Sequence, residues 1–93
     1  MFLLVSRYTA PLEQIEELVP AHREYLRRLF DEGVFVVSGR RVPWTGGAIV
    51  ARGTRQRVEA AVAEDPLTRA GAAETEIVEV DPRFWADGFD PFL

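Results

Sequence analysis

His22 is the single histidine of this 93-residue chain, and its neighbours in the sequence suggest a role in proton transfer. Its helical spacing places it among apolar residues, namely Ile15, Leu18, Val19, Leu26 and Leu29. The ring should therefore point toward the core, where an imidazole can act as an acid or a base near neutral pH. The alternative is a core histidine that one hydrogen bond satisfies. Spacing alone leaves both interpretations open.

Asp65 extends a second stripe of helical spacing, formed by Val58, Ala61 and Val62. A carboxylate on an apolar face requires a charged or hydrogen-bonding partner, and His22 can be that partner if both helices cover the same side of a sheet. A His–Asp pair joins a base to the group that orients it. Without a nucleophile beside it, the pair fits general acid/base chemistry on a bound substrate. Alternatively, Asp65 accepts backbone N–H groups and caps the loop over residues 66–71.

Ser38 and Arg40 close a predicted strand, on the same side as Val34 and Val36. A serine hydroxyl can bind a substrate oxygen, and a guanidinium can hold a carboxylate or a phenolate. We therefore take Ser38 and Arg40 as candidate substrate-binding residues. The alternative is an ordinary solvated strand end.

The residue types that the chain lacks narrow its chemistry. It has no cysteine and no lysine, because all 11 of its basic residues are arginine. This excludes disulfides, thiolate nucleophiles, cysteine-ligated metals and Schiff-base chemistry. One histidine also leaves no multi-histidine metal site, so we expect neither a metal nor a cofactor. The net charge of −4 argues against a nucleic-acid partner.

Length and composition predict one globular domain over residues 1–93. Apolar residues make up 47% of the chain and charged residues 28%, which is typical of folded proteins. No apolar run approaches the ~18 residues of a membrane helix, so we expect no membrane partner. The first seven residues have no basic region before their apolar stretch and are typical of a strand rather than a signal peptide. We therefore expect a cytoplasmic protein.

The predicted elements follow the order β-α-β-β-α-β. Strands are predicted over residues 2–8, 34–39, 48–51 and 75–80, and helices over 12–30 and about 55–64. Pro20 should kink or split the first helix, Gly33 should end it, and Thr54 should cap the second. This order is typical of a ferredoxin-like α+β fold, in which two helices cover one face of an antiparallel sheet.

The other sheet face and the C-terminal tail should both be covered by a partner or by the chain itself. The strands carry apolar residues on both faces, and an uncovered apolar face exceeds what monomers usually expose. We therefore expect a homodimer or a higher even oligomer, because a two-fold partner is the commonest solution. Within the C-terminal tail over residues 81–93, the part from Phe84 to Leu93 should be ordered and should pack on its own chain or on the partner. It carries four aromatic residues, Phe84, Trp85, Phe89 and Phe92.

Several short stretches are informative together, although none is specific alone. They are Pro20-Ala21-His22, Tyr25-Leu26, Phe30-Asp31-Glu32-Gly33, Ser38-Gly39, residues 45–51, Asp65-Pro66-Leu67 and Arg69-Ala70-Gly71. In this order and spacing, over the chain up to about Val80, the sequence resembles the YciI-like (YCII-related) family of small bacterial proteins.

The resemblance implies a dimeric α+β barrel of ferredoxin-like domains, with relatives among muconolactone isomerases and cofactor-free monooxygenases. It also implies an active site centred on a histidine and an aspartate, which correspond to His22 and Asp65. One branch resembles dehydrochlorinases that act on chlorinated hydroxyhydroquinones. Arg40, Trp44 and Leu67 depart from the family pattern, which often has proline, a polar or basic residue, and an aromatic residue there. The resemblance therefore leaves the substrate open.

Three functions fit these observations. The first is a cofactor-free lyase or isomerase for a small aromatic or enolisable substrate. In it His22 is the acid or base, Asp65 orients it, and Ser38 and Arg40 hold a substrate oxygen. The second is a non-catalytic, dimeric binding or regulatory module that holds a small metabolite in the same cleft. The third is a structural partner of another protein that docks through the aromatic tail.

Overall fold

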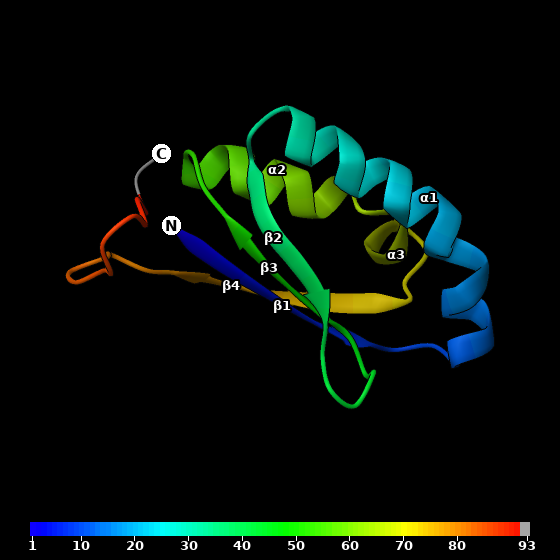
Figure 1. Ribbon diagram of the computed structural model, residues 1–93. Coiled ribbons are helices and arrows are strands. Elements are labelled where there is room, and N and C mark those ends of the chain that lie inside the picture. The colour runs from blue at the N-terminus through cyan, green and yellow to red at the C-terminus, as the bar shows by residue number, and fades with distance from the viewer. Residues whose placement is uncertain (92–93) are drawn as a thin grey trace.

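A four-stranded antiparallel sheet carries all of the helices on one face in the computed structural model, which describes residues 1–91 (Figure 1). The strands lie in the order β2-β3-β1-β4, and each neighbouring pair is antiparallel. This is the ferredoxin-like α+β arrangement that the sequence predicted. The elements along the chain are β1 (Phe2–Tyr8), α1 (Leu12–Asp31), β2 (Phe35–Arg40), β3 (Gly47–Ala51), α2 (Arg55–Glu64), α3 (Pro66–Arg69) and β4 (Ala73–Glu79).

Helix α1 is continuous through Pro20, so the proline does not split it as the sequence allowed. The helix packs its inner face on both sides of that position, because Ile15 and Leu29 are both fully buried. Burial of these side chains offsets the hydrogen bond that a proline removes. Gly33 follows the helix with φ 75, and its amide donates to the Phe30 carbonyl at 3.0 Å. The predicted end of the helix is thus confirmed.

The segment that the sequence predicted as a loop over residues 66–71 begins with a short helix, α3. The face therefore carries three helices rather than the two that we expected. Thr54 caps α2 as predicted, accepting the Arg57 amide at 3.1 Å. Asp65 ends α2 and caps α3, and Pro66 has the fixed φ that favours a first helical position. The turn between the two helices thus holds the Asp65 side chain near the sheet.

A bulge in β2 decides which of its side chains face the helices. Phe35 pairs with Ala51 and Val37 with Val50, so that Val36 is an extra residue on this strand. Ser38 and Arg40 follow on the same side as Phe35. The expectation that Val36 shares this side is wrong, because Val36 lies on the other face, beside Val50. The alternation used in the sequence analysis does not hold across a bulge.

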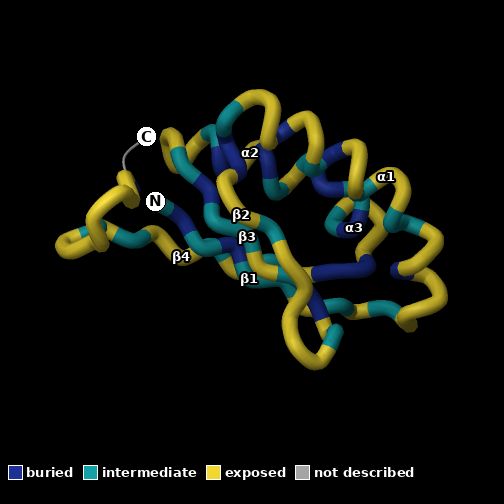
Figure 2. Tube along the Cα trace, in the orientation of Figure 1, coloured by how far each residue is buried: buried dark blue, intermediate teal, exposed yellow. Residues whose placement is uncertain are grey.

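The main core lies between the helices and the sheet, where the buried positions gather (Figure 2). Two clusters form it. The first joins α1 and α2 to the strands around Phe2, Leu4, Leu29, Phe35 and Val58. The second lies under α3, around Ile15 and Leu67. Between them the two clusters fix the positions of α1 and α3 over the sheet.

The sheet face away from the helices, here called the open face, carries apolar side chains on all four strands. Val37 and Val78 are 58% and 37% exposed there. The homodimer expected from this feature stays a prediction. The apolar side chains on this face include Leu3, Val5, Val36, Val37, Ala48, Val50 and Val78.

The tail extends beyond the end of β4 and then turns back toward the N-terminus (Figure 1). Phe89 and Pro91 border a small hollow beside Val36, whereas Phe84 is 98% exposed and does not pack on its own chain. Packing of Phe84 on a partner remains a prediction, and Phe92 lies outside the described residues. None of the helices in residues 1–91 has both the length and the apolar character of a membrane span.

Candidate functional site

A cavity of about 390 Å³ lies between α1, α3 and the helix-covered face of the sheet. Its volume suits a small organic molecule. All four of the candidate residues from the sequence line it. The apolar lining includes Leu4, Ile15, Val19, Leu26, Ile49 and Val62, and the polar lining includes Ser6, Tyr8, His22, Arg23, Ser38, Arg40, Trp44, Asp65 and Thr75.

His22 and Asp65 are in direct contact on the wall of this cavity. The distance from His22 Nδ1 to Asp65 Oδ1 is 3.0 Å, and the two side chains are 22% and 12% exposed. Asp65 Oδ1 also accepts the Leu67 amide at 2.9 Å. The two roles that the sequence offered for Asp65, a partner for His22 and a backbone cap, therefore occur together. The cap at the start of α3 orients the carboxylate toward α1.

This contact fixes the tautomer of His22. A carboxylate only accepts hydrogen bonds, so Nδ1 carries the proton when Asp65 is ionised. A neutral His22 then has its lone pair on Nε2, where it can take a proton. The protonated ring can return that proton, while the carboxylate stabilises its positive charge. The arrangement can thus support general acid/base chemistry.

Tyr25 packs beside this pair and holds α1 against α2. Its ring centroid lies 5.7 Å from that of His22, and its hydroxyl donates to the Ala61 carbonyl at 2.7 Å. Burial, and then the charges of Asp65 and Glu64, raise the pKa of Tyr25 well above its usual range. Tyr25 is therefore a protonated, structural hydrogen-bond donor that keeps the helices carrying His22 and Asp65 in place.

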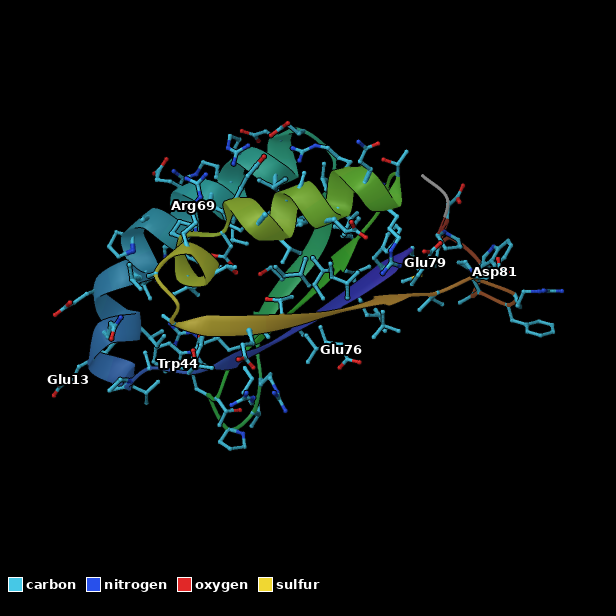
Figure 3. All side chains as sticks on the ribbon, turned by 180° about the vertical axis from the view of Figure 1, so that it is seen from behind. Glu13, Trp44, Arg69, Glu76, Glu79 and Asp81 are labelled. Carbon is cyan, nitrogen blue, oxygen red and sulfur yellow. The ribbon has the colours of Figure 1, made fainter. Side chains whose placement is uncertain are left out.

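Arg40 and Trp44 add a cation on an aromatic surface to the same cavity. The guanidinium carbon of Arg40 lies 3.8 Å from the centroid of the Trp44 ring, which is a cation–π contact. Trp44 lies near the first turns of α1 (Figure 3) and packs against the cluster of Ile15. Its indole N–H donates to the Tyr8 hydroxyl at 2.7 Å. Arg40 and Tyr8 are thus both positioned by one indole ring.

The loop that carries Trp44, residues 41–46, is closely attached to β1. The Tyr8 amide donates to the Thr45 carbonyl at 2.9 Å, and the Gly47 amide donates to Ser6 Oγ at 2.9 Å. Gly46 lies against the same strand, because a Cβ there would be 1.9 Å from the Ser6 carbonyl oxygen. Only glycine permits this approach, which fixes the position of the loop.

The comparison with protein families settles the family of this chain. The model of the YCII-related domain matches residues 1–81. The chain belongs to the YCII-related family. The resemblance drawn from the short sequence stretches is thereby confirmed. A search of the curated proteins found no match.

This YCII-related domain also has a similar solved structure. It is the 5-chloro-2-hydroxyhydroquinone dehydrochlorinase (TftG) from Burkholderia phenoliruptrix AC1100, in complex with 2,5-dihydroxybenzoquinone. The TM-score is 0.71 and the sequence identity 23%, over 87% of this chain and 94% of the dehydrochlorinase chain. At this identity the similarity establishes a common fold.

Among the polar residues of the YCII-related domain's cavity that were not candidates from the sequence, three lie on strands, namely Ser6, Tyr8 and Thr75. The signal that could have identified them is the alternation of side chains along a strand, which places every second residue on the same face. Ser6 and Tyr8 share a face of β1 with the buried Phe2 and Leu4, and Thr75 pairs with Ser6 across the sheet. Polar side chains at the end of a core-facing row mark the place where the core opens into a cavity.

Proposed function

We propose that this YCII-related domain is a cofactor-free lyase or isomerase for a small aromatic or enolisable substrate. The observation that carries the proposal is the contact of 3.0 Å between His22 Nδ1 and Asp65 Oδ1 on the wall of a cavity. It supplies a base with a defined tautomer, a partner for its charge, and room for a ligand beside it.

In the proposed reaction, His22 Nε2 takes a proton from a substrate carbon or hydroxyl. Asp65 stabilises the imidazolium that forms, and Ser38 and Arg40 hold the substrate oxygen on which negative charge develops. In an isomerisation, His22 returns the proton to a different carbon. In an elimination, the electron pair left by the proton forms a double bond while a halide departs with the pair from its own bond to carbon. Neither path requires an oxidant or a reductant.

The similar solved structure supports the substrate class. The dehydrochlorinase catalyses the loss of HCl from an aromatic ring according to its name, and it was solved with a quinone. A cavity of about 390 Å³ suits a ring of that size. The three departures at Arg40, Trp44 and Leu67 line this cavity as well, so we expect a substrate that differs from that of the dehydrochlorinase.

A screen for turnover tests the proposal. Chlorinated and hydroxylated hydroquinones, catechols and enol lactones would be incubated with wild type, His22→Ala and Asp65→Asn, while chloride release and ultraviolet absorbance are followed. We expect turnover by wild type and a loss of about 10²–10⁴-fold in His22→Ala, with an unchanged circular dichroism spectrum. Turnover that persists in His22→Ala would contradict the proposal.

The second candidate is a non-catalytic module that binds a small metabolite, and the same cavity favours it. Calorimetric titration of each screened compound separates the two functions. Compounds that bind wild type and His22→Ala with equal affinity, and that neither protein converts, would support the binding module against the enzyme.

A further inference from the structure

The direction of the hydrogen bond between Trp44 and Tyr8 determines what the Tyr8 hydroxyl can do. An indole nitrogen only donates, so the Tyr8 oxygen is the acceptor in their contact of 2.7 Å. Among residues 1–91 this is the one hydrogen bond of the hydroxyl. Its own proton is therefore available to an acceptor in the cavity, which Tyr8 lines.

Arg40 brings a positive charge to the same cavity. Within the described part of the chain it forms no ion pair, in contrast to Arg7, Arg28 and Arg55. The Trp44 ring holds its guanidinium at 3.8 Å without neutralising the charge or occupying its N–H donors. Arg40 is thus positioned but still free to bind an anion.

The overall charge of the lining is consistent with an anionic occupant. Two arginines, Arg23 and Arg40, line the cavity together with one carboxylate, Asp65, which is already paired with His22. Among residues 1–91, no glutamate lines it. The chain as a whole carries −4, so this cationic lining runs against the net charge of the protein.

We propose that Tyr8 and Arg40 form an oxyanion site that selects substrates with a carboxylate or phenolate oxygen. The Tyr8 hydroxyl donates one hydrogen bond to that oxygen, and the Arg40 guanidinium donates another and supplies the charge. Trp44 is a positioning residue, because it orients the Tyr8 hydroxyl and holds Arg40. The proposal rests on the proposed function only in taking this cavity as the substrate site.

Binding of 4-nitrophenol tests the oxyanion site without any turnover. Its phenolate form is yellow, so preferential binding of the anion increases the absorbance when protein is added near the pKa of the free ligand. The neutral comparison ligand is 4-nitroanisole, which has the same ring and cannot ionise. We expect wild type to bind the phenolate at least about tenfold more tightly than 4-nitroanisole.

Conservative variants assign the effect to the named groups. Tyr8→Phe keeps the ring beside Trp44, and we expect it to weaken phenolate binding about tenfold, as the loss of a hydrogen bond to a charged group predicts. Arg40→Gln should weaken it by at least as much. Arg41→Gln is the matched control, because Arg41 is the adjacent exposed arginine and does not line the cavity. Its affinity should stay within about twofold of wild type.

The outcomes separate this inference from the proposed function. Equal affinity of wild type for the two ligands, no binding of either, or unchanged phenolate binding in Tyr8→Phe would each overturn the oxyanion site. Should Tyr8→Phe fail to fold, Trp44→Phe replaces it, and unchanged phenolate binding in that variant has the same meaning. Expected phenolate binding without turnover of any compound would contradict the proposed enzyme alone. Turnover that depends on His22 without a preference for the phenolate would contradict the oxyanion site alone.

Discussion

His22 Nδ1 and Leu67 N both donate to Asp65 Oδ1, at 3.0 and 2.9 Å. One carboxylate oxygen therefore orients the imidazole and caps α3. Stability and proton transfer depend on the same atom in this protein, and substitutions of Asp65 can separate the two.

Asp65→Asn should preserve stability, whereas Asp65→Ala should not. Asparagine caps helices as well as aspartate does, but alanine loses the cap at a cost of about 1 kcal/mol. For a domain of this size that corresponds to a decrease in Tm of about 4–8 °C. Thermal unfolding followed by circular dichroism measures it. Asp81→Ala is the control, because Asp81 is exposed and its ion pair with Arg83 lies at the surface. An Asp65→Asn variant that melts as low as Asp65→Ala would contradict the assignment.

Tyr25 should make the protein less stable at high pH. Its pKa is raised in the folded state, first by burial and then by the charges of Asp65 and Glu64. The unfolded chain therefore loses the phenol proton first, and above about pH 10 the free energy of unfolding should fall by up to about 1.4 kcal/mol per pH unit. Below that pH the stability from this group is fully present. Urea titrations from pH 8 to 11 of wild type and Tyr25→Phe test this.

The Tyr25→Phe variant shows how much of the alkaline loss of stability comes from Tyr25. Tyr25→Phe should be less stable at neutral pH by about 1–3 kcal/mol, because the Ala61 carbonyl loses its buried donor. The difference between the two proteins should then shrink as the pH rises above about 10. A constant difference across that range would show that Tyr25 does not cause the alkaline loss.

Two glycines near the cavity should respond in opposite ways to alanine. A Cβ at Gly46 would lie 1.9 Å from the Ser6 carbonyl oxygen, whereas one at Gly39 would meet nothing within 4 Å. Gly46→Ala should force the loop away from β1 and destabilise the protein by about 1–3 kcal/mol. It should also move Trp44 and thus weaken ligand binding. Gly39→Ala should be neutral or slightly stabilising. Chemical denaturation measures both, and equal losses would refute the close approach.

The open face should form the interface of a homodimer. Val37, on the edge strand β2 of this face, is 58% exposed, and Val42, in the loop after β2, is 97% exposed. Val37→Asp should shift the protein toward the monomer, because a charge would be buried in the interface, whereas Val42→Asp should leave the mass unchanged. Light scattering at micromolar concentration gives the masses. A monomeric wild type, or a dimer that is insensitive to Val37→Asp, would count against this interface.

The order of the elements and the contact between His22 and Asp65 were predictable from the sequence, because both depend on the periodic spacing of apolar residues. The stripes of α1 and α2 placed His22 and Asp65 on the same side of the sheet, and their contact follows from that placement. Thr54 and Gly33 marked helix ends through local hydrogen-bonding and backbone requirements. These signals lie within a few residues of the features that they predict.

The remaining features depend on tertiary structure. Helix α3 is a four-residue helix, too short for any apolar period to show. The bulge at Val36 exists only with respect to the partner strand β3, so no alternation within β2 could reveal it. The role of Trp44 depends on a loop that brings its ring between Tyr8 and Arg40, which are 32 positions apart in the sequence. A single sequence contains no direct record of such contacts.

The extra residue in β2 shifts the alternation of side chains between the two faces of the sheet by one position. Before Val36 the strand alternates in one phase, with Phe35 turned toward the helices, and after Val37 it alternates in the other, with Ser38 and Arg40 turned toward the cavity. Deleting Val36 would remove the bulge and leave these three side chains facing as they do now. Deleting one residue between Ser38 and Arg40 instead would change the phase at the cavity and point Arg40 outward. The number of residues on either side of Val36 therefore determines which β2 side chains face the cavity.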